Sequence, residues 1–240
     1  MPKSAAPQAT RPYSERYYEQ FGLDDDRVAL WFYARLLRRL RPRGGRLLDF
    51  GCGTGHLLRR LSGHFEVYGY DASPHARNRC RLTAPDALVL EEWESTAPES
   101  FDLIVSLHTL EHLERPQPVM RGLAERLAPG GLFLFVVPNP GGFGHRLKGR
   151  GWFGYRDSTH RSLLTRSEWV MMVRRAELRV LWVRGDGMWD PPYVGLLPVS
   201  WQRVLFGAPA ALQVIAPFGP FLPPSLGECL IIAATKNTRQ

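Results

Sequence analysis

The stretch Leu47-Leu48-Asp49-Phe50-Gly51-Cys52-Gly53-Thr54-Gly55 decides the fold class. Its first four residues have the composition of a buried strand end, and a helix is predicted to begin near His56. The three glycines between them allow a tight turn, because a backbone without Cβ atoms can approach a ligand closely and adopt unusual φ angles. A dinucleotide-binding fingerprint reads G-x-G-x-x-G, which would need glycine where this chain has His56. The stretch therefore predicts a ligand-binding strand, turn and helix that depart from the dinucleotide pattern.

An acidic residue follows the next predicted strand. That strand ends at Tyr68-Gly69-Tyr70, and Asp71 and Ala72 come directly after it. An acid at the tip of the second strand of a βαβ unit can accept hydrogen bonds from both hydroxyls of a ribose. The pattern therefore predicts that Asp71 binds the ribose of a cofactor.

Five further strands are predicted downstream. They lie at 87–90, 101–108, the second half of 127–137, 178–183 and 228–235. Helical patterns separate most of these strands, which is the alternation of a doubly wound α/β protein. The sequence therefore predicts a Rossmann-like α/β fold, in which a seven-stranded, mostly parallel sheet carries helices on both faces.

A chain of 240 residues with 44% hydrophobic residues is long and apolar enough for one large α/β domain. Its Pro- and Ala-rich start predicts a disordered tail. The expected organisation is a tail at 1–12 and a single domain at 13–240, which comprises an N-terminal helical lid (13–44), a cofactor-binding core (45–183), a hydrophobic insertion (184–227) and the last strand (228–235).

Within the insertion, the segment 193–224 is rich in Leu, Val, Phe, Trp and Pro, and Arg203 is its only charged residue. Its prolines leave no apolar run of about 18 residues, so no membrane-spanning helix is predicted. They also predict short helices and turns in place of one long helix. Four roles stay open for the segment: a cap over the substrate, a dimer surface, a membrane-surface segment, or a cover for an exposed face of the sheet.

The net charge of +8 and the pI of about 9.8 suit three kinds of partner: nucleic acid, acidic lipid or a phosphorylated substrate. Lys occurs only at 3, 148 and 236, so the charge is nearly all Arg, a skew that genome composition alone also produces. The three cysteines lie far apart without a C-x-x-C motif, which predicts a reducing compartment and no structural zinc. No apolar core follows Met1, so we expect a cytoplasmic protein without a signal peptide.

The glycine turn, Asp71, the strand 101–108 and the segment 127–137 resemble, in this order and spacing, the class I S-adenosylmethionine-dependent methyltransferases. Two later segments resemble the branch of ubiquinone-biosynthesis-type O-methyltransferases, which is similar to methyltransferase domain 23. These segments are His108-x-x-Glu111-His112-Leu113 and Arg156-Asp157-Ser158-Thr159-His160. The resemblance implies S-adenosyl-L-methionine as cofactor and O-methylation of a small hydrophobic or lipid-like hydroxylated molecule.

The resemblance also implies roles around the glycine turn. Asp49 would help to hold the methionine part of the cofactor, and Asp71 its ribose. An acid after the third strand would contact the adenine amino group; Glu91 and Glu92 compete for this role, and we favour Glu92. A tyrosine of the lid, Tyr17 or Tyr18, would close over the cofactor. The expected cofactor-binding residues are Asp49, Gly51, Cys52, Gly53, Gly55, Asp71, Ala72, Glu92 and Tyr17.

Two histidines are the candidates for a catalytic general base. His108 follows the fourth strand, and His160 ends a long Gly-rich loop predicted at 139–160. Both are expected at the carboxyl edge of the sheet, where open α/β sheets bind ligands. An imidazole can take the proton of a substrate hydroxyl, and the alternative for each histidine is a hydrogen-bonded structural role. His108 and His112 would share one face of a helix, but no H-E-x-x-H pattern is present, so no metal is predicted.

Other functions stay open. Asp190-Pro191-Pro192-Tyr193 spells the catalytic motif of amino-group nucleic-acid methyltransferases, but that motif must follow the fourth strand, where this chain has His108. The alternatives are a sugar or polyketide O-methyltransferase, a non-catalytic cofactor-binding partner protein and a nucleic-acid methyltransferase. Basic and imidazole side chains suggest an anionic group on the substrate: His145, Arg146, Lys148, Arg150, Arg156 and Arg161. The expected partners are a small-molecule substrate and the inner face of a membrane, without specific nucleic-acid binding; the oligomeric state stays open.

Overall fold

A computed structural model of the chain describes residues 13, 15–20, 26–27, 29–187, 191–215 and 222–237. The predicted tail at 1–12 lies outside these residues. The described strands form one seven-stranded sheet in the order β3-β2-β1-β4-β5-β7-β6. Their bounds are β1 Arg46–Phe50, β2 Glu66–Tyr70, β3 Leu88–Val89, β4 Phe101–Leu107, β5 Leu127–Pro138, β6 Leu178–Gly185 and β7 Cys229–Lys236. Among the described strands only β7 runs opposite to the other six, so its pairings with β5 and β6 are antiparallel, which confirms the predicted sheet.

Helices cover both faces of this sheet. Leu47 and Leu48 are successive residues of β1, and they belong to opposite hydrophobic clusters because side chains alternate along a strand. The cluster of Leu47 includes buried side chains of α2 (Ala29–Leu40) and α3 (His56–Leu61), and that of Leu48 includes side chains of α5 (Pro116–Arg126) and α8 (Arg166–Arg175). The α-helices are α1 Glu15–Gln20, α2 Ala29–Leu40, α3 His56–Leu61, α4 Pro74–Thr83, α5 Pro116–Arg126, α6 Phe143–Lys148, α7 Phe153–Arg156, α8 Arg166–Arg175 and α9 Val199–Ile215.

Two helix starts follow local sequence signals. The Ser73 hydroxyl accepts a hydrogen bond from the backbone N–H of Ala76, and Pro74 fills the first helical position of α4. At α8 the Thr165 side chain accepts from the backbone N–H of Glu168, whose carboxylate accepts from the backbone of Thr165 in return. Both caps place helices that flank the carboxyl edge of the sheet.

The predicted long loop at 139–160 is wrong in part, because this segment contains α6, α7 and a short 3-10 turn at Gly149–Gly151. Trp152 is fully buried between these pieces, and its ring packs edge-on against His145 and Tyr155. Glycine and proline spacing gave no helical period here, since each helix is only one or two turns long. Packing of aromatic side chains around Trp152 inside the segment, which the spacing of glycine and proline does not report, accompanies these short helices.

The prediction for the insertion is also wrong in one respect, because α9 is a single helix of 17 residues that continues through Pro209. A proline removes one backbone hydrogen bond of a helix, at a cost of about 3 kcal/mol, without necessarily ending it. Packing of α9 against α2 helps to retain the helix. Among the residues that the structure describes, no helix has both the length and the hydrophobicity that crossing a membrane requires.

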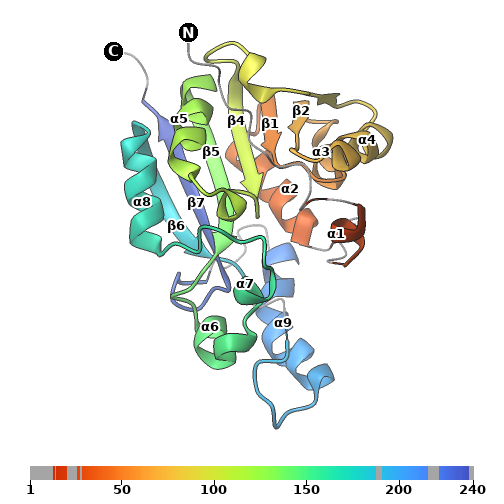
Figure 1. The fold of residues 1–240 in the computed structure, drawn as a ribbon, viewed down its shortest axis with the longest axis vertical. Coiled ribbons are helices and arrows are strands. Elements are labelled where there is room, and N and C mark those ends of the chain that lie inside the picture. The colour runs from red at the N-terminus through yellow and green to blue at the C-terminus, as the bar shows by residue number, and fades with distance from the viewer. Residues whose placement is uncertain are drawn as a thin grey trace.

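Figure 1 shows α6, α7 and α9 gathered at the lower end of the molecule, beyond the tip of β4, with α9 reaching farthest from the sheet. The lid helix α1 lies on the right, at about the height of the tip of β4. The carboxyl ends of the parallel strands therefore face the lid, the 139–160 segment and the insertion together.

Candidate functional site

The turn after β1 can be built only from glycine. Gly51, Gly53 and Gly55 have φ angles of 84°, 53° and 87°, in the left-handed region that other residues rarely adopt. A Cβ on Gly51 would lie 2.0 Å from Oγ1 of Thr109, and one on Gly55 would lie 2.7 Å from Sγ of Cys80. A Cβ on Gly53 would meet only the lid, at 3.9 Å from a ring carbon of Tyr18. The turn is thus packed on its inner side and faces the lid on its outer side.

Asp71, at the end of β2, is fixed against this turn. Its Oδ2 accepts a hydrogen bond from the backbone N–H of Gly53 at 3.0 Å, and its Oδ1 accepts one from the backbone N–H of Ser73 at 2.9 Å. Burial raises the pKa of Asp71, and these two bonds oppose the rise. The carboxylate is held in one orientation at the mouth of the turn, with Ala72 beside it.

Asp49 is a second buried acid, located inside β1 just before the turn. Burial, followed by the charge of Asp71, raises the pKa of Asp49 to about 8. A buried acid of this kind favours a cationic group placed beside it, because the cation stabilises the ionised form.

The thiol of Cys52 points into the core. Its Sγ lies 3.9 Å from Sγ of Cys80 on α4, and both side chains are buried. The backbone N–H groups of Gly51 and Cys52 donate to the carbonyl of Tyr70 at 2.7 and 2.9 Å. Cys52 therefore contributes its backbone to the turn, which it ties to the end of β2.

Of the two acids after β3, Glu91 is already engaged. Its carboxylate accepts hydrogen bonds from Arg77 and Arg81 at 2.8 and 2.5 Å. Glu92 is exposed and precedes the 3-10 turn Trp93–Ser95. This leaves Glu92, the predicted adenine contact, with the more accessible carboxylate.

His108 stands at the tip of β4 with a φ of 52°, which is uncommon for a residue with a side chain and typical of functional sites. Its Nδ1 lies 3.4 Å from Oε1 of the fully buried Glu111. Burial raises the pKa of Glu111, but the neighbouring His108 and the charge of His112 outweigh it, so that the net pKa is lowered. Glu111 and His112 lie on a 3-10 turn, Leu110–His112, and His108 precedes this turn. The prediction that His108 and His112 share one face of a helix is therefore wrong.

His160 and His112 lie ring to ring, with centroids 4.7 Å apart. The Thr159 hydroxyl donates to Asp157 Oδ1 at 2.6 Å, so it must accept the 2.8 Å bond from Nδ1–H of His112. Nδ1–H of His160 donates to the carbonyl of Gly154 at 2.8 Å. In both rings the proton is thereby assigned to Nδ1, which leaves Nε2 as the acceptor.

One ligand atom from each of Glu111, His112 and His160 lies within 4.8 Å of the other two. Imidazole and carboxylate are ligand types that metal ions such as zinc accept. These are the residues through which the site could hold a metal ion, and the sequence offered no such pattern. The absence of a metal stays a prediction.

The lid contacts both halves of the site. Tyr18 donates from its hydroxyl to Asp71 at 3.2 Å, whereas the hydroxyl of Tyr17 donates to Asp157 at 3.0 Å. The backbone carbonyl of Tyr13 accepts from the Ser73 hydroxyl at 2.7 Å. Tyr17, predicted at the cofactor, thus lies on the histidine side, and Tyr18 lies at the glycine turn.

A further buried acid, Asp186, was missed by the sequence analysis. It follows β6, and its carboxylate accepts from the Tyr33 hydroxyl at 3.1 Å and from the backbone N–H of Cys229 at 2.9 Å. Burial raises the pKa of Asp186. The signal that identified Asp71, an acid directly after a strand, also applies to Asp186 and could have found it.

In the described part of the Asp-Pro-Pro-Tyr sequence, Tyr193 has a structural role. Asp190 lies outside the described residues, and Tyr193 is buried, with its hydroxyl donating to Glu228 at 2.7 Å. Nζ of Lys148 lies 4.5 Å from the centre of the Tyr193 ring and 3.5 Å from Oε1 of Glu228. Tyr193 therefore fastens the insertion to α6 and β7, and its ring is not open for stacking on a base.

Comparisons with known proteins agree with this geometry. Residues 25–183 match the family described as Methyltransferase domain. The ubiquinone biosynthesis O-methyltransferase of Cereibacter sphaeroides strain ATCC 17025 is 30% identical over 193 residues, which cover 74% of each chain. The protein of the same name from Xanthomonas axonopodis pv. citri is 30% identical over 187 residues, covering 69% of this chain and 71% of its own.

Solved structures show the same fold at lower identity. An S-adenosylmethionine-dependent methyltransferase from Thermotoga maritima superposes with a TM-score of 0.65 at 18% identity, covering 92% of this chain and 95% of its own. One from Archaeoglobus fulgidus superposes with a TM-score of 0.61 at 18% identity, covering 91% of this chain and all of its own.

Proposed function

Because the chain belongs to the methyltransferase domain family and is an S-adenosylmethionine-dependent methyltransferase, we propose that it methylates a hydroxyl oxygen of a small hydrophobic or lipid-like molecule. The single observation that supports this most is the group of histidines at the carboxyl edge, where Nδ1 of His108 lies 3.4 Å from the buried carboxylate of Glu111. The names of the relatives in two bacterial genera support oxygen as the methylated atom.

The residues present fit the cofactor. The glycine turn leaves a backbone face beside the fixed carboxylate of Asp71, and buried Asp49 suits the cationic methionine end. When bound, S-adenosylmethionine supplies an electrophilic methyl group on a sulfonium. We assign its binding to the turn residues 51–55, to Asp71 with Ala72 for the ribose, to Asp49 for the methionine part and to Glu92 for the adenine.

The histidines would move the proton of the substrate. Nε2 of His108 or His160 takes the proton of the hydroxyl as its oxygen becomes a nucleophile, and Glu111 or Asp157 stabilises the imidazolium that forms. His108 Nδ1 lies 3.4 Å from Glu111, and His160 Nε2 lies 3.9 Å from Asp157 Oδ2. General base catalysis of this kind contributes about 100- to 10,000-fold, and the remaining acceleration comes from positioning.

The substrate class can be tested with matched phenols. We expect the protein to methylate a long-chain alkyl catechol and to leave the analogue with both hydroxyls blocked unmodified, because only the first offers an oxygen nucleophile. Mass spectrometry of the products with S-adenosylmethionine as donor measures this. A water-soluble catechol should be used at least about tenfold less efficiently, since it buries less apolar surface. Preference for a sugar or for RNA over the alkyl catechol would contradict the proposal.

The exposed face of α9 supports a membrane partner in this proposal. Trp201, Val204 and Leu205 are 71%, 72% and 62% exposed, and their i, i+3, i+4 spacing places them on one face of the helix. Leu196, which precedes the helix, is 96% exposed. A groove of about 570 Å³ is lined by Leu197, Ser200, Trp201, Val204 and Leu205. An apolar stripe of this kind suits the interface of a lipid bilayer.

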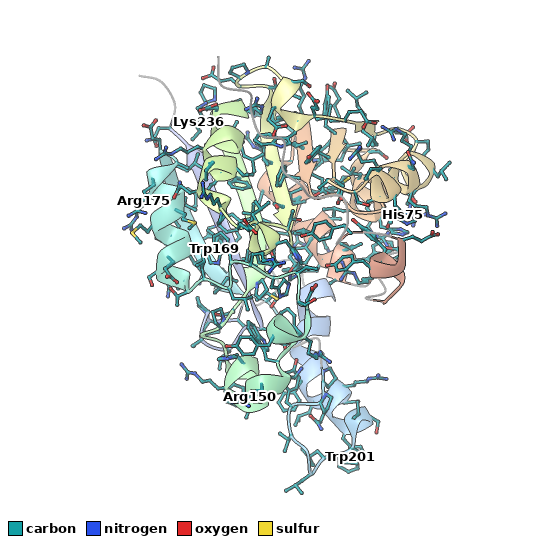
Figure 2. All side chains as sticks on the ribbon, viewed as in Figure 1. His75, Arg150, Trp169, Arg175, Trp201 and Lys236 are labelled. Carbon is teal, nitrogen blue, oxygen red and sulfur yellow. The ribbon has the colours of Figure 1, made fainter. Side chains whose placement is uncertain are left out.

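Charge favours an anionic bilayer as the occupant. Residues 191–215 contain no acid and one base, Arg203. Figure 2 places Arg150 in the same lower part of the molecule as Trp201, at the opposite end from Lys236. Basic side chains near an anionic surface contribute about 1 kcal/mol each. In this proposal the protein works at the inner face of the membrane, and a hydrophobic substrate reaches the carboxyl edge of the sheet along α9.

Vesicle co-sedimentation tests this partner. We expect the protein to bind vesicles with anionic lipid, and we expect Trp201→Ser with Leu205→Ser to weaken binding at least about tenfold, because each buried side chain contributes about 1.5–3 kcal/mol. Leu82→Ser is the matched control, since Leu82 is 74% exposed on the distant helix α4. A control that weakens binding equally would contradict a specific surface. A concentration-dependent dimer that the double variant abolishes would assign the stripe to a second copy of the chain.

A further inference from the structure

Two adjacent tyrosines of α1 hold opposite halves of the site. Successive residues on a helix point about 100° apart, so Tyr17 and Tyr18 reach different partners. Tyr18 donates to Asp71 at the glycine turn, and Tyr17 donates to Asp157 beside the histidines. The rings of Tyr17 and Tyr18 lie edge to face with centroids 5.7 Å apart, and both belong to one helix of six residues.

The hydrogen bonds of Asp71 leave too few acceptor positions for a ribose. A carboxylate offers about four lone-pair positions. Three are used, by the backbone N–H groups of Gly53 and Ser73 and by the hydroxyl of Tyr18. The two backbone donors belong to the turns that form the site, whereas Tyr18 belongs to the lid. A ribose that presents two hydroxyls needs two positions, and the second becomes free only when Tyr18 withdraws.

Steric access leads to the same conclusion. Tyr18 is 4% exposed and Asp71 is 8% exposed, so the ring and the carboxylate cover each other. The ring of Tyr18 also lies next to Gly53, at 3.9 Å from the position that a Cβ would take there. The lid therefore occupies the outer side of the turn, which is the side that a ligand must approach.

We propose that the Tyr18 hydroxyl holds the place of a ribose hydroxyl on Asp71, and that cofactor binding displaces α1 and thereby breaks the bond between Tyr17 and Asp157. This inference rests on the role proposed above for Asp71. Asp157 keeps its two bonds from Thr159 at 2.8 and 2.6 Å, and it then faces His160 with one donor fewer. Cofactor binding thus frees Asp157, beside His160, from the Tyr17 hydroxyl. We therefore expect the cofactor to bind before the hydroxylated substrate.

The two hydroxyls can be removed one at a time. Tyr18→Phe keeps the ring and loses the donor, so we expect it to bind S-adenosylhomocysteine about three- to tenfold more tightly than the unaltered protein, the range that one hydrogen bond gives. Tyr17→Phe should also tighten binding, by about two- to fivefold, because it raises the fraction of molecules with a displaced lid. Titration calorimetry measures both affinities, and melting temperatures verify that the variants are folded.

Tyr68→Phe is the matched control, because its hydroxyl bonds Glu66 within β2 and should leave the affinity unchanged. Weaker binding by Tyr18→Phe would make Tyr18 a direct contact of the bound cofactor and overturn the exchange. Unchanged binding by Tyr17→Phe would show that α1 does not move as one unit and overturn the coupling. If the unaltered protein does not bind S-adenosylhomocysteine, the role of Asp71 fails with the inference. Binding in the expected order without methylation of a catechol would contradict only the proposed substrate class.

Discussion

Replacement of His108 by Ala should lower turnover by about 100- to 10,000-fold while the affinity for S-adenosylhomocysteine stays within about twofold, because a general base acts on the substrate and not on the cofactor. The same result is expected for His160→Ala if His160 is the base. Single-turnover methylation of a long-chain catechol, measured from pH 6 to pH 9, tests each variant for the loss of a general base, since that loss should be smallest where the free phenol is already ionised.

His64→Ala is the control for this experiment, because His64 bonds the carbonyl of Arg41, directly after α2, and contacts none of the three histidine-site residues named above. Turnover that survives both replacements would remove the general base and leave positioning alone. The assay is run with a chelator present. Loss of turnover in the chelator and its return with a divalent metal ion would assign Glu111, His112 and His160 to a metal site instead.

Asp49→Asn should change the pH dependence of stability. The pKa of Asp49 rises from 3.8 in the unfolded chain to about 8 in the fold. Between these two values the folded protein holds a proton that the unfolded chain has released, so the free energy of unfolding falls as pH rises. Asparagine cannot ionise, and the variant escapes this loss. Its stability relative to the unaltered protein should therefore rise by about 2–4 kcal/mol from pH 5 to pH 9, where 1.36 kcal/mol per pKa unit sets the upper bound.

Urea unfolding at the two pH values measures this difference, and cofactor titration at pH 8 should show weaker binding by the variant, because the carboxylate is lost. Asp86→Asn is the matched control, since Asp86 is an exposed carboxylate in the turn after α4. Parallel pH profiles for Asp49→Asn and the unaltered protein would contradict a raised pKa at Asp49.

The sheet could be predicted because the local pattern of apolar and acidic residues identifies most of its strands. Leu47 and Leu48 alternate between two cores, and Asp71 directly follows a strand, so local order and spacing fix the strands that carry the turn. The positions of Tyr17 and Tyr18 could not be predicted in the same way. Which of two neighbouring tyrosines faces Asp71 depends on the docking of α1, and that is decided by contacts with residues 53 to 140 positions away in the chain.

The same limit explains what was missed beyond the core. Helices as short as α6 and α7 have too few turns for a helical period of apolar residues to appear in the sequence. The burial of Trp152 between them is known only from the three-dimensional structure. Asp186 carries the same local signal as Asp71, an acid directly after a strand, but its partner Cys229 lies 43 positions away in the chain. Contacts in three dimensions, which local propensity does not report, hold these parts of the site in place.

The stem of the insertion suggests how such a protein can diversify. Gly185 and Leu222 exchange two backbone hydrogen bonds, of 2.7 and 3.1 Å, so the chain leaves the sheet and returns to it at one closed point. Lengthening a loop whose ends are already joined costs little, since each doubling of its length adds only about 0.6 kcal/mol. The loop beyond this stem can therefore change in length at little cost, while the glycine turn and its acids stay unchanged. Substrate range and methyl-donor chemistry can then evolve as separate traits of a single chain.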